Sequence, residues 1–361
     1  MLFVLGETAS LPPSNFPAPT IYAPPLRHFI DTQDLDQSEL LRIFDLSTLL
    51  KNADQVGACP KLLDGASLGI IFEEPSTRTR VSFEVAMTKL GGHALYLRPG
   101  EIHLGVRESL EDTTKVISRM VDVIEARTLK HQTVLEFAKY SSVPVLNGLT
   151  DYIHPIQAVC DIFTTLEHRQ AGKPMSDVHI TFVCDATNVC SSLMFICTQM
   201  GMHFTHAAPT QYQAPVTWQA IAQANIETHG GSLTLTEDVV AAVKCADFIY
   251  TDLWWWVGRE AEIPDRTKAF MPKYQVNEAL LDAAPAHVKF MHCPPASRGV
   301  EVTDAVLYGA RCIAFDQAEN RLHIEKVLLV HFVLPRLKRP SADLKAWHAA
   351  KVSDFLEREG M

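Results

Sequence analysis

The segment "SLGIIFEEPSTRTRVSFEVAM" (residues 67–87) contains the patterns of two different elements in direct succession. Its first part, "SLGIIF", reads as a short buried strand, and "VSFEVAM" places apolar residues at helical spacing. The polar stretch between them is rich in Ser, Thr and Arg, and it falls where the strand would turn into the helix. A strand that leads through such a turn into a helix is the repeating unit of an α/β fold.

The same alternation of helix and strand patterns continues outward from this segment. Strand patterns at 93–97, 121–127 and 143–149 alternate with helical ones, which predicts an open parallel sheet in a first domain over residues 34–152. A second series predicts another α/β domain with its own parallel sheet over residues 153–325. The expected fold class is therefore α/β, with two open parallel-sheet domains joined by interdomain helices.

The two ends of the chain differ from this pattern. Residues 1–33 are rich in Pro and lack periodicity, so we expect an extended arm outside the core, on the surface or on a neighbouring subunit. Residues 326–361 contain helical patterns that we expect to return to the first domain or to a neighbouring subunit. With 361 residues, 47% of them hydrophobic, the chain can bury two cores.

Charge and cysteine content exclude several classes of partner. The formal net charge is −10 and basic runs are short, so no nucleic-acid partner is expected. The eight cysteines show neither zinc-finger nor redox spacing, which favours reduced thiols. The sequence shows no secretion signal and no run of about 18 uncharged apolar residues. We therefore expect a cytoplasmic protein without a membrane partner.

The polar turn at residues 76–79 predicts an anion site. In open α/β sheets, ligands bind beyond the carboxyl ends of the strands, where the backbone N–H groups of a following helix point outward. Ser76, Thr77, Arg78 and Thr79 would add hydroxyls and a guanidinium that suits phosphate. The alternative is an ordinary helix cap beside surface arginines, because Ser and Thr are common N-caps.

Three further predicted strand ends carry polar residues. Arg127 follows "VDVIEA", and "NGLTDYIHPIQ" places Asn147, His154 and Gln157 together. A third strand pattern, "VKFMHCPP", ends in Cys293 followed by two prolines. Taken singly, each of these has a structural alternative. Arg127 could be a solvated loop arginine, His154 could be a loop histidine before Pro, and the prolines after Cys293 could form a rigid turn.

Five motifs in this order carry a resemblance to a known family. The stretches "STRTR", "ARTLKH", "HPIQ", "HCPPA" and "FDQAENRLH" stand in the order and spacing of the aspartate/ornithine carbamoyltransferase family, and the resemblance covers residues 33–335. It implies transfer of a carbamoyl group between carbamoyl phosphate and a small amine, without a metal or an organic cofactor.

The resemblance also implies roles for individual residues. Ser76, Thr77, Arg78 and Thr79 would hold the phosphate, and Arg80 would brace their loop from behind. The catalytic candidates are Arg127, His154, Cys293 and Arg321. Of these, Arg127 and His154 would approach the carbamoyl group together with Gln157, and Arg321, Cys293 and the carbonyl of Pro294 would complete the pocket. A nucleophilic cysteine is unnecessary, because an amine can attack the carbamoyl carbon directly.

Members of this family are trimers with shared active sites, so a homotrimer is expected. The matching loop, "GEIHLGVRESLEDT", places His103 where Gln is common, and we expect it to contact phosphate in a neighbouring subunit. The stretch "HCPP" stands where "HCLP" is usual. Pro294 keeps the carbonyl but lacks the N–H donor.

The amine is expected to bind the second domain. Asn147, Asn188, Asp252, Trp254 and Cys293 are the candidate contacts. Ornithine-type members carry a Ser-Met-Gly loop after the aspartate, whereas this chain has "DLWWWVGREAE", whose indoles cannot satisfy a desolvated carboxylate. This favours an amine without that carboxylate, with putrescine first and with ornithine or another amine as the alternative. The tryptophans could instead pack between the domains.

Two other classes fit parts of the sequence. A nicotinamide-dependent dehydrogenase would share the α/β pattern, but "HITFVCDATNVCSS" lacks the glycine fingerprint of such enzymes. A catalytically silent paralogue would share the whole fold. The complete set of Arg78, Arg127, His154, Gln157 and Arg321 argues against it.

Overall fold

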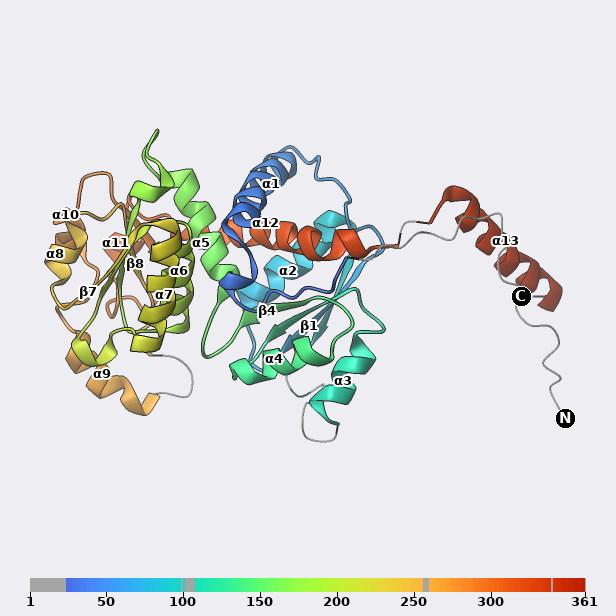
Figure 1. The fold of residues 1–361 in the computed structure, drawn as a ribbon, viewed down its shortest axis with the longest axis horizontal. Coiled ribbons are helices and arrows are strands. Elements are labelled where there is room, and N and C mark those ends of the chain that lie inside the picture. The colour runs from blue at the N-terminus through green and yellow to red at the C-terminus, as the bar shows by residue number, and fades with distance from the viewer. Residues whose placement is uncertain (1–23, 99, 101–107, 256–259, 339, 361) are drawn as a thin grey trace. The chain divides into compact units, whose positions relative to one another are not determined.

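The computed structural model describes residues 24–98, 100, 108–255, 260–338 and 340–360. Residues 26–334 form one compact unit, and residues from the two chain ends form another. The compact unit contains two parallel sheets, so the predicted fold class is confirmed (Figure 1). Among the described residues, no helix combines the length and apolarity needed to cross a membrane.

The first sheet has the strand order β2-β1-β3-β4, and all of its strands are parallel. Strands β1, β3 and β4 are buried along almost their whole length, whereas the edge strand β2 is partly exposed. The strands are β1 (Ser67–Phe72), β2 (His93–Leu97), β3 (Val123–Arg127) and β4 (Val145–Leu149). The helices of this half are α1 (Gln37–Gln55), α2 (Thr77–Leu90), α3 (Leu110–Ile117) and α4 (His131–Tyr140). Helix α5 (Pro155–His168) follows β4 and contacts both β4 and α6.

The second sheet has the order β7-β6-β5-β8-β9 and is also entirely parallel. Its strands are β5 (His179–Val183), β6 (His203–Ala207), β7 (Ser232–Thr236), β8 (Phe248–Thr251) and β9 (Lys289–His292). The helices that follow these strands are α6 (Asn188–Gln199), α7 (Val216–His229), α8 (Val239–Val243), α9 (Ile263–Phe270), α10 (Glu278–Asp282) and α11 (Asp304–Leu307). Short 3₁₀ turns lie at Thr32–Asp34, Met175–Asp177, Thr210–Tyr212 and Glu260–Glu262.

One long helix connects the second half back to the first. Helix α12 (Ala314–Val333) follows the second sheet and packs against α1, α2 and α5. Figure 1 shows it running through the first half beside α1 and α2. The helix is continuous through residue 325, so it crosses the position at which the sequence suggested that the second domain ends. Its course carries Arg321 of the "ENRLH" motif to Gln157 on α5 and Thr79 on α2.

The end of the N-terminal arm belongs to the core, contrary to the expectation for residues 1–33. Phe29 is fully buried, and its backbone pairs with β4 through a 2.8 Å hydrogen bond to the carbonyl of Val145. Ile30 is buried in the same core. The proline-rich composition ends at Pro25, so the residues after it can donate to a strand edge. Residues 1–23 lie outside the described residues.

The C-terminal residues form a 3₁₀ turn at Leu334–Arg336 and the helix α13 (Ala342–Glu359). Ser341 caps α13 by accepting a hydrogen bond from the Leu344 amide, and Gly360 ends the helix in a left-handed conformation. None of its described side chains is buried within this chain. The helical pattern predicted for this segment is therefore present.

Candidate active site

The candidate residues follow the carboxyl ends of strands from both sheets, as the α/β architecture requires. They are Ser76–Thr79 after β1, Arg127 at the end of β3, His154 and Gln157 after β4, Asn188 after β5, Asp252 after β8, and Cys293 and Pro294 after β9. Arg321 arrives separately, on α12.

Ser76 is the N-cap of α2, but its side chain does not cap the helix. Its hydroxyl instead donates to Oγ1 of Thr79 at 3.1 Å. The first backbone N–H groups of α2 therefore have no side-chain acceptor in the described part of the chain, and a helix start of this kind attracts anions.

Two arginines of this turn have different surroundings. Arg78 has no partner among the residues that the structure describes, and burial lowers its pKa. Arg80 pairs with Glu84 at 2.8 Å, and its guanidinium stacks over Tyr96 at 4.2 Å. Arg78 is thus available to a ligand, whereas Arg80 braces the edge of the sheet.

Arg321 brings residues of three helices together. Its Nη1 donates to Oε1 of Gln157 at 2.8 Å and to Nε2 of His154 at 3.2 Å, and its Nη2 reaches Oγ1 of Thr79 at 3.4 Å. Arg321 is only 5% exposed, so it is fixed by these contacts. Four of the predicted site residues therefore meet at one buried guanidinium.

His154 is a neutral imidazole in this arrangement. A guanidinium can only donate, so Nε2 of His154 accepts from Arg321 and the ring proton lies on Nδ1. Burial and the charges of Arg321 and Arg127 lower the pKa of His154 well below its usual value. Its buried Nδ1 has no partner among the described residues, which leaves an N–H donor for a ligand oxygen.

Arg127 ends β3, and its carbonyl accepts from the amide of Glu73 at 3.0 Å. Burial lowers its pKa, while the nearby carboxyl of Glu125 acts in the opposite direction. Besides burial, the charges of Arg321 and Arg127 both lower the pKa of His154, so both cations lie near its ring. The cations of this region can stabilise negative charge on a ligand.

The cysteine after β9 is a thiol. Burial raises the pKa of Cys293 to about 12, and the carboxyls of Asp252 and Asp161 act in the same direction. Such a group is a poor nucleophile at neutral pH because the thiolate is the reactive form. The Pro294–Pro295 peptide bond that follows is cis.

Two second-half candidates lie near the loop after β4. Asn188 begins α6 and donates through Nδ2 to the carbonyl of Thr150 at 2.6 Å. Asp252 accepts from the hydroxyl of Thr187 at 3.1 Å, and burial raises its pKa. Because Thr187 directly precedes Asn188, these two residues occupy the same edge.

Two further candidate amine contacts, Asn147 and Trp254, are buried in the protein core. Asn147 is fully buried within β4, and its amide donates to the carbonyl of Ile30 at 2.8 Å. Trp254 is also fully buried and stacks on Phe270 with ring centroids 5.3 Å apart. In this conformation Trp254 belongs to the core of the second half, not to an open wall. His103 and Trp256 lie outside the described residues.

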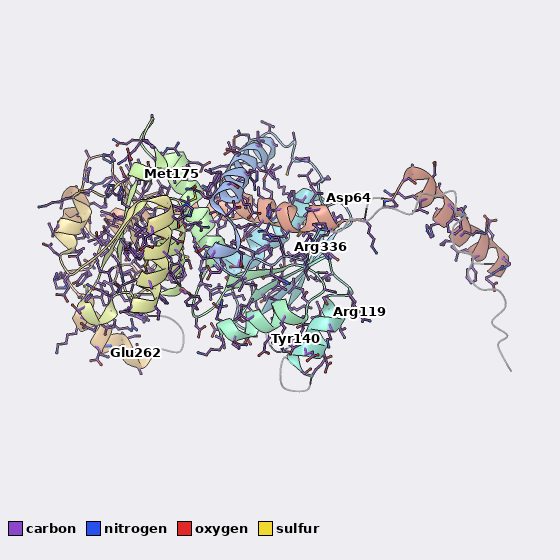
Figure 2. All side chains as sticks on the ribbon, viewed as in Figure 1. Asp64, Arg119, Tyr140, Met175, Glu262 and Arg336 are labelled. Atoms are coloured by element: carbon purple, nitrogen blue, oxygen red, sulfur yellow. The ribbon has the colours of Figure 1, made fainter. Side chains whose placement is uncertain are left out.

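Sequence reasoning missed a set of buried acids beneath the site. Asp161 lies four residues after Gln157 and Glu325 lies four residues after Arg321, and burial raises the pKa of each carboxyl to about 7. Glu125 is buried in β3 with neither oxygen partnered among the described residues. The helical spacing of the first two acids was the available signal. By contrast, Glu262 is 44% exposed and pairs with Arg266 at 2.8 Å near the start of α9 (Figure 2).

Two family models match the chain in succession. The one described as aspartate/ornithine carbamoyltransferase, carbamoyl-P binding domain, matches residues 27–167. The one described as aspartate/ornithine carbamoyltransferase, Asp/Orn binding domain, matches residues 176–332.

Individual relatives agree with these matches. A putrescine carbamoyltransferase of Mycoplasma capricolum is 54% identical over 342 residues, which is 92% of this chain and 93% of the relative. An ornithine carbamoyltransferase of Pyrococcus horikoshii is 44% identical over 303 residues, 84% of this chain and 94% of the relative. The solved ornithine carbamoyltransferase of Pyrococcus furiosus superposes with a TM-score of 0.82 at 43% identity and covers 86% of this chain and 98% of that one.

Proposed function

Because this chain belongs to the aspartate/ornithine carbamoyltransferase family, it is a carbamoyltransferase, and we propose that the amine partner of carbamoyl phosphate is putrescine. The observation that carries the proposal is the 54% identity, over 92% of the chain, to a relative named putrescine carbamoyltransferase. Three relatives named ornithine carbamoyltransferase are 42–45% identical to this chain over 84% of its length. Carbamoyl transfer to ornithine is the second candidate.

In the proposed reaction, the neutral nitrogen of the amine attacks the carbamoyl carbon, and the bond from that carbon to the phosphate oxygen breaks. The amine proton leaves with the phosphate or to solvent. Negative charge develops on the carbonyl oxygen and on the departing phosphate. Donors fixed in a buried site stabilise such charge without having to reorganise.

We assign the first half of the chain to carbamoyl phosphate. The start of α2, with Ser76, Thr77, Arg78 and Thr79, would hold the phosphate, which the uncapped N–H groups and the unpaired Arg78 support. His154 and Arg127 would donate to the carbonyl oxygen. Gln157, Arg321 and the carbonyl of Pro294 would surround the carbamoyl amide.

The second half would bind the amine. Asp252 and Asn188 lie on the edge that faces the loop after β4, and Cys293 would contribute a neutral thiol. The ammonium that does not react needs an acceptor, and the carboxylate of Asp252, which follows β8, would serve. Among the described residues of the second half, Arg266 is paired with Asp185 and Glu262 and is therefore already neutralised. A substrate carboxylate would compete with those pairs, which favours a diamine over ornithine.

We further propose that the protein is a homotrimer in which His103 of one subunit completes the phosphate site of a neighbouring subunit. We also propose that it is located in the cytoplasm. The free state of all eight cysteines supports a reducing compartment. Sedimentation would report the oligomeric state. Mixing inactive His103→Ala and Arg78→Ala proteins should restore part of the activity if sites are shared, because some hybrid sites would contain neither substitution. An active monomer would contradict this part.

The reaction itself is tested by incubating the full chain with carbamoyl phosphate and putrescine. Mass spectrometry should detect N-carbamoylputrescine together with an equal amount of released phosphate. Failure to release phosphate with any amine of a panel that includes ornithine and aspartate would favour a catalytically silent paralogue.

A further inference from the structure

Asp161 lies directly beneath Gln157, one turn later on α5, and is fully buried. Its Oδ1 accepts from Nε2 of Gln157 at 2.7 Å and from Nε2 of Gln317 at 2.6 Å. Its Oδ2 has no partner among the described residues. Two amide groups thus converge on one carboxyl oxygen below the carbamoyl site.

Gln317 is itself held in one orientation. Its Nε2 also donates to the hydroxyl of Tyr250 at 2.9 Å, and its Oε1 accepts from the backbone amide of His292 at 3.1 Å. Strands β8 and β9 therefore fix this side chain, and its NH₂ group must face Asp161. The position of the carboxyl does not depend on Gln157 alone.

The two partners of Gln157 specify the orientation of its amide. A carboxylate oxygen that receives two amide donors demands the NH₂ group, and the guanidinium of Arg321 demands the carbonyl oxygen. A flipped amide would set NH₂ against the guanidinium and C=O against the carboxyl. Asp161 and Arg321 thus direct Oε1 of Gln157 to the side of the site occupied by Arg321 and His154.

An amide oxygen has two lone pairs, and Arg321 occupies one. The other can accept from an N–H group of the ligand. Carbamoyl phosphate offers an NH₂ group, whereas acetyl phosphate has a methyl group at the same place and is otherwise nearly the same shape. We propose that Asp161 is a positioning residue that keeps Gln157 an acceptor and thereby makes the enzyme select carbamoyl phosphate over acetyl phosphate.

This inference rests on the proposed function, since it assumes that Gln157 faces the carbamoyl group. The test measures the inhibition constants of acetyl phosphate and inorganic phosphate, and the KM of carbamoyl phosphate, in the putrescine assay. It compares the wild type with Asp161→Ala, Asp161→Leu and Asp161→Asn. The leucine variant fills the cavity that alanine would leave, and asparagine retains a neutral acceptor at Oδ1.

In the wild type, we expect acetyl phosphate to bind at least about tenfold more weakly than carbamoyl phosphate, because a buried acceptor would face a methyl group. Alanine and leucine should reduce this preference about tenfold, since the amide of Gln157 can then turn. The inhibition constant of inorganic phosphate should change less than about threefold, and asparagine should restore most of the preference.

The inference is overturned if the alanine or leucine variant keeps the wild-type preference. It is also overturned if affinity for inorganic phosphate falls in parallel, because that result indicates a collapsed site. A wild-type chain that releases no phosphate from carbamoyl phosphate with any amine would instead contradict the proposed function, so the two failures are distinguishable.

Discussion

A single oxygen of Glu325 holds the guanidinium of Arg321, accepting from Nε at 3.1 Å and from Nη2 at 2.8 Å. Both side chains are buried, and they lie one turn apart on α12. The pair leaves Nη1 of Arg321 free to reach Gln157 and His154. Glu325 thus sets the direction of the guanidinium and the net charge of the Arg321–Glu325 pair.

Glu325→Gln should make the affinity for carbamoyl phosphate less dependent on pH. Burial raises the pKa of Glu325 to about 7, so the carboxyl loses its proton as the pH rises through this value. The negative charge that appears beside Arg321 weakens the binding of an anion. In the wild type, the KM of carbamoyl phosphate should therefore rise between about pH 6 and about pH 8. The glutamine variant should flatten that rise, and an unchanged pH profile would speak against this role of Glu325.

Arg78→Ala should lower kcat/KM by at least about a hundredfold, because it removes a charge-assisted contact to the departing phosphate. The free energy of unfolding should change by less than about 1 kcal/mol, since Arg78 has no described partner to lose. Arg80→Ala is the matched control. It removes an exposed pair with Glu84 and should leave kcat/KM within about tenfold of the wild type. Equal losses in the two variants would contradict the distinction between them.

Cys293 should react slowly with iodoacetamide at neutral pH. Its pKa of about 12 leaves almost no thiolate, and alkylation depends on the thiolate. Peptide mapping by mass spectrometry should show the exposed Cys245 modified well before Cys293. Cys293→Ala should keep activity within about tenfold of the wild type, because no covalent step is needed. Complete loss of turnover in a folded alanine variant would show that the thiol takes part in the chemistry.

Burial of Asp161 should make the substrate-free protein less stable as the pH rises. The pKa of this carboxyl is about 7 in the folded state and about 4 when unfolded, so the folded state binds the proton more tightly. This contribution is complete below about pH 4 and is lost as the pH rises through about 7. Urea unfolding should give a lower free energy at about pH 8 than at about pH 5.5, and Asp161→Asn should reduce the difference. A steeper decline in the variant would contradict this assignment.

Much of the fold was predictable because residues 67–87 combine a continuous apolar strand with a helix of clear periodicity. Strand ends then predicted Arg127, His154 and Gln157, since parallel strands deliver their carboxyl ends to one edge. The acid beneath them was not predictable in the same way. Asp161 alone on a helix reads as a solvated residue, and only the packing of α12 on α5 reveals that Gln317 covers it. Trp254 was a candidate amine contact, but its side chain is fully buried. A run of three tryptophans does not indicate which of the three side chains packs into the core.

Whether putrescine is the amine substrate of this carbamoyltransferase is decided by the ratio of its kcat/KM values for putrescine and ornithine, measured at saturating carbamoyl phosphate. Ornithine would bring a carboxylate toward the carboxyl of Asp252, and the guanidinium of Arg266 is already paired with Asp185 and Glu262. An unpaired, desolvated charge costs several kcal/mol, so putrescine should be favoured by about a hundredfold or more. For diamines one methylene shorter or longer, the lower kcat/KM should correspond to a loss of only about 1–3 kcal/mol in transition-state binding. Equal or greater efficiency with ornithine would contradict putrescine as the substrate and assign the chain to ornithine carbamoylation.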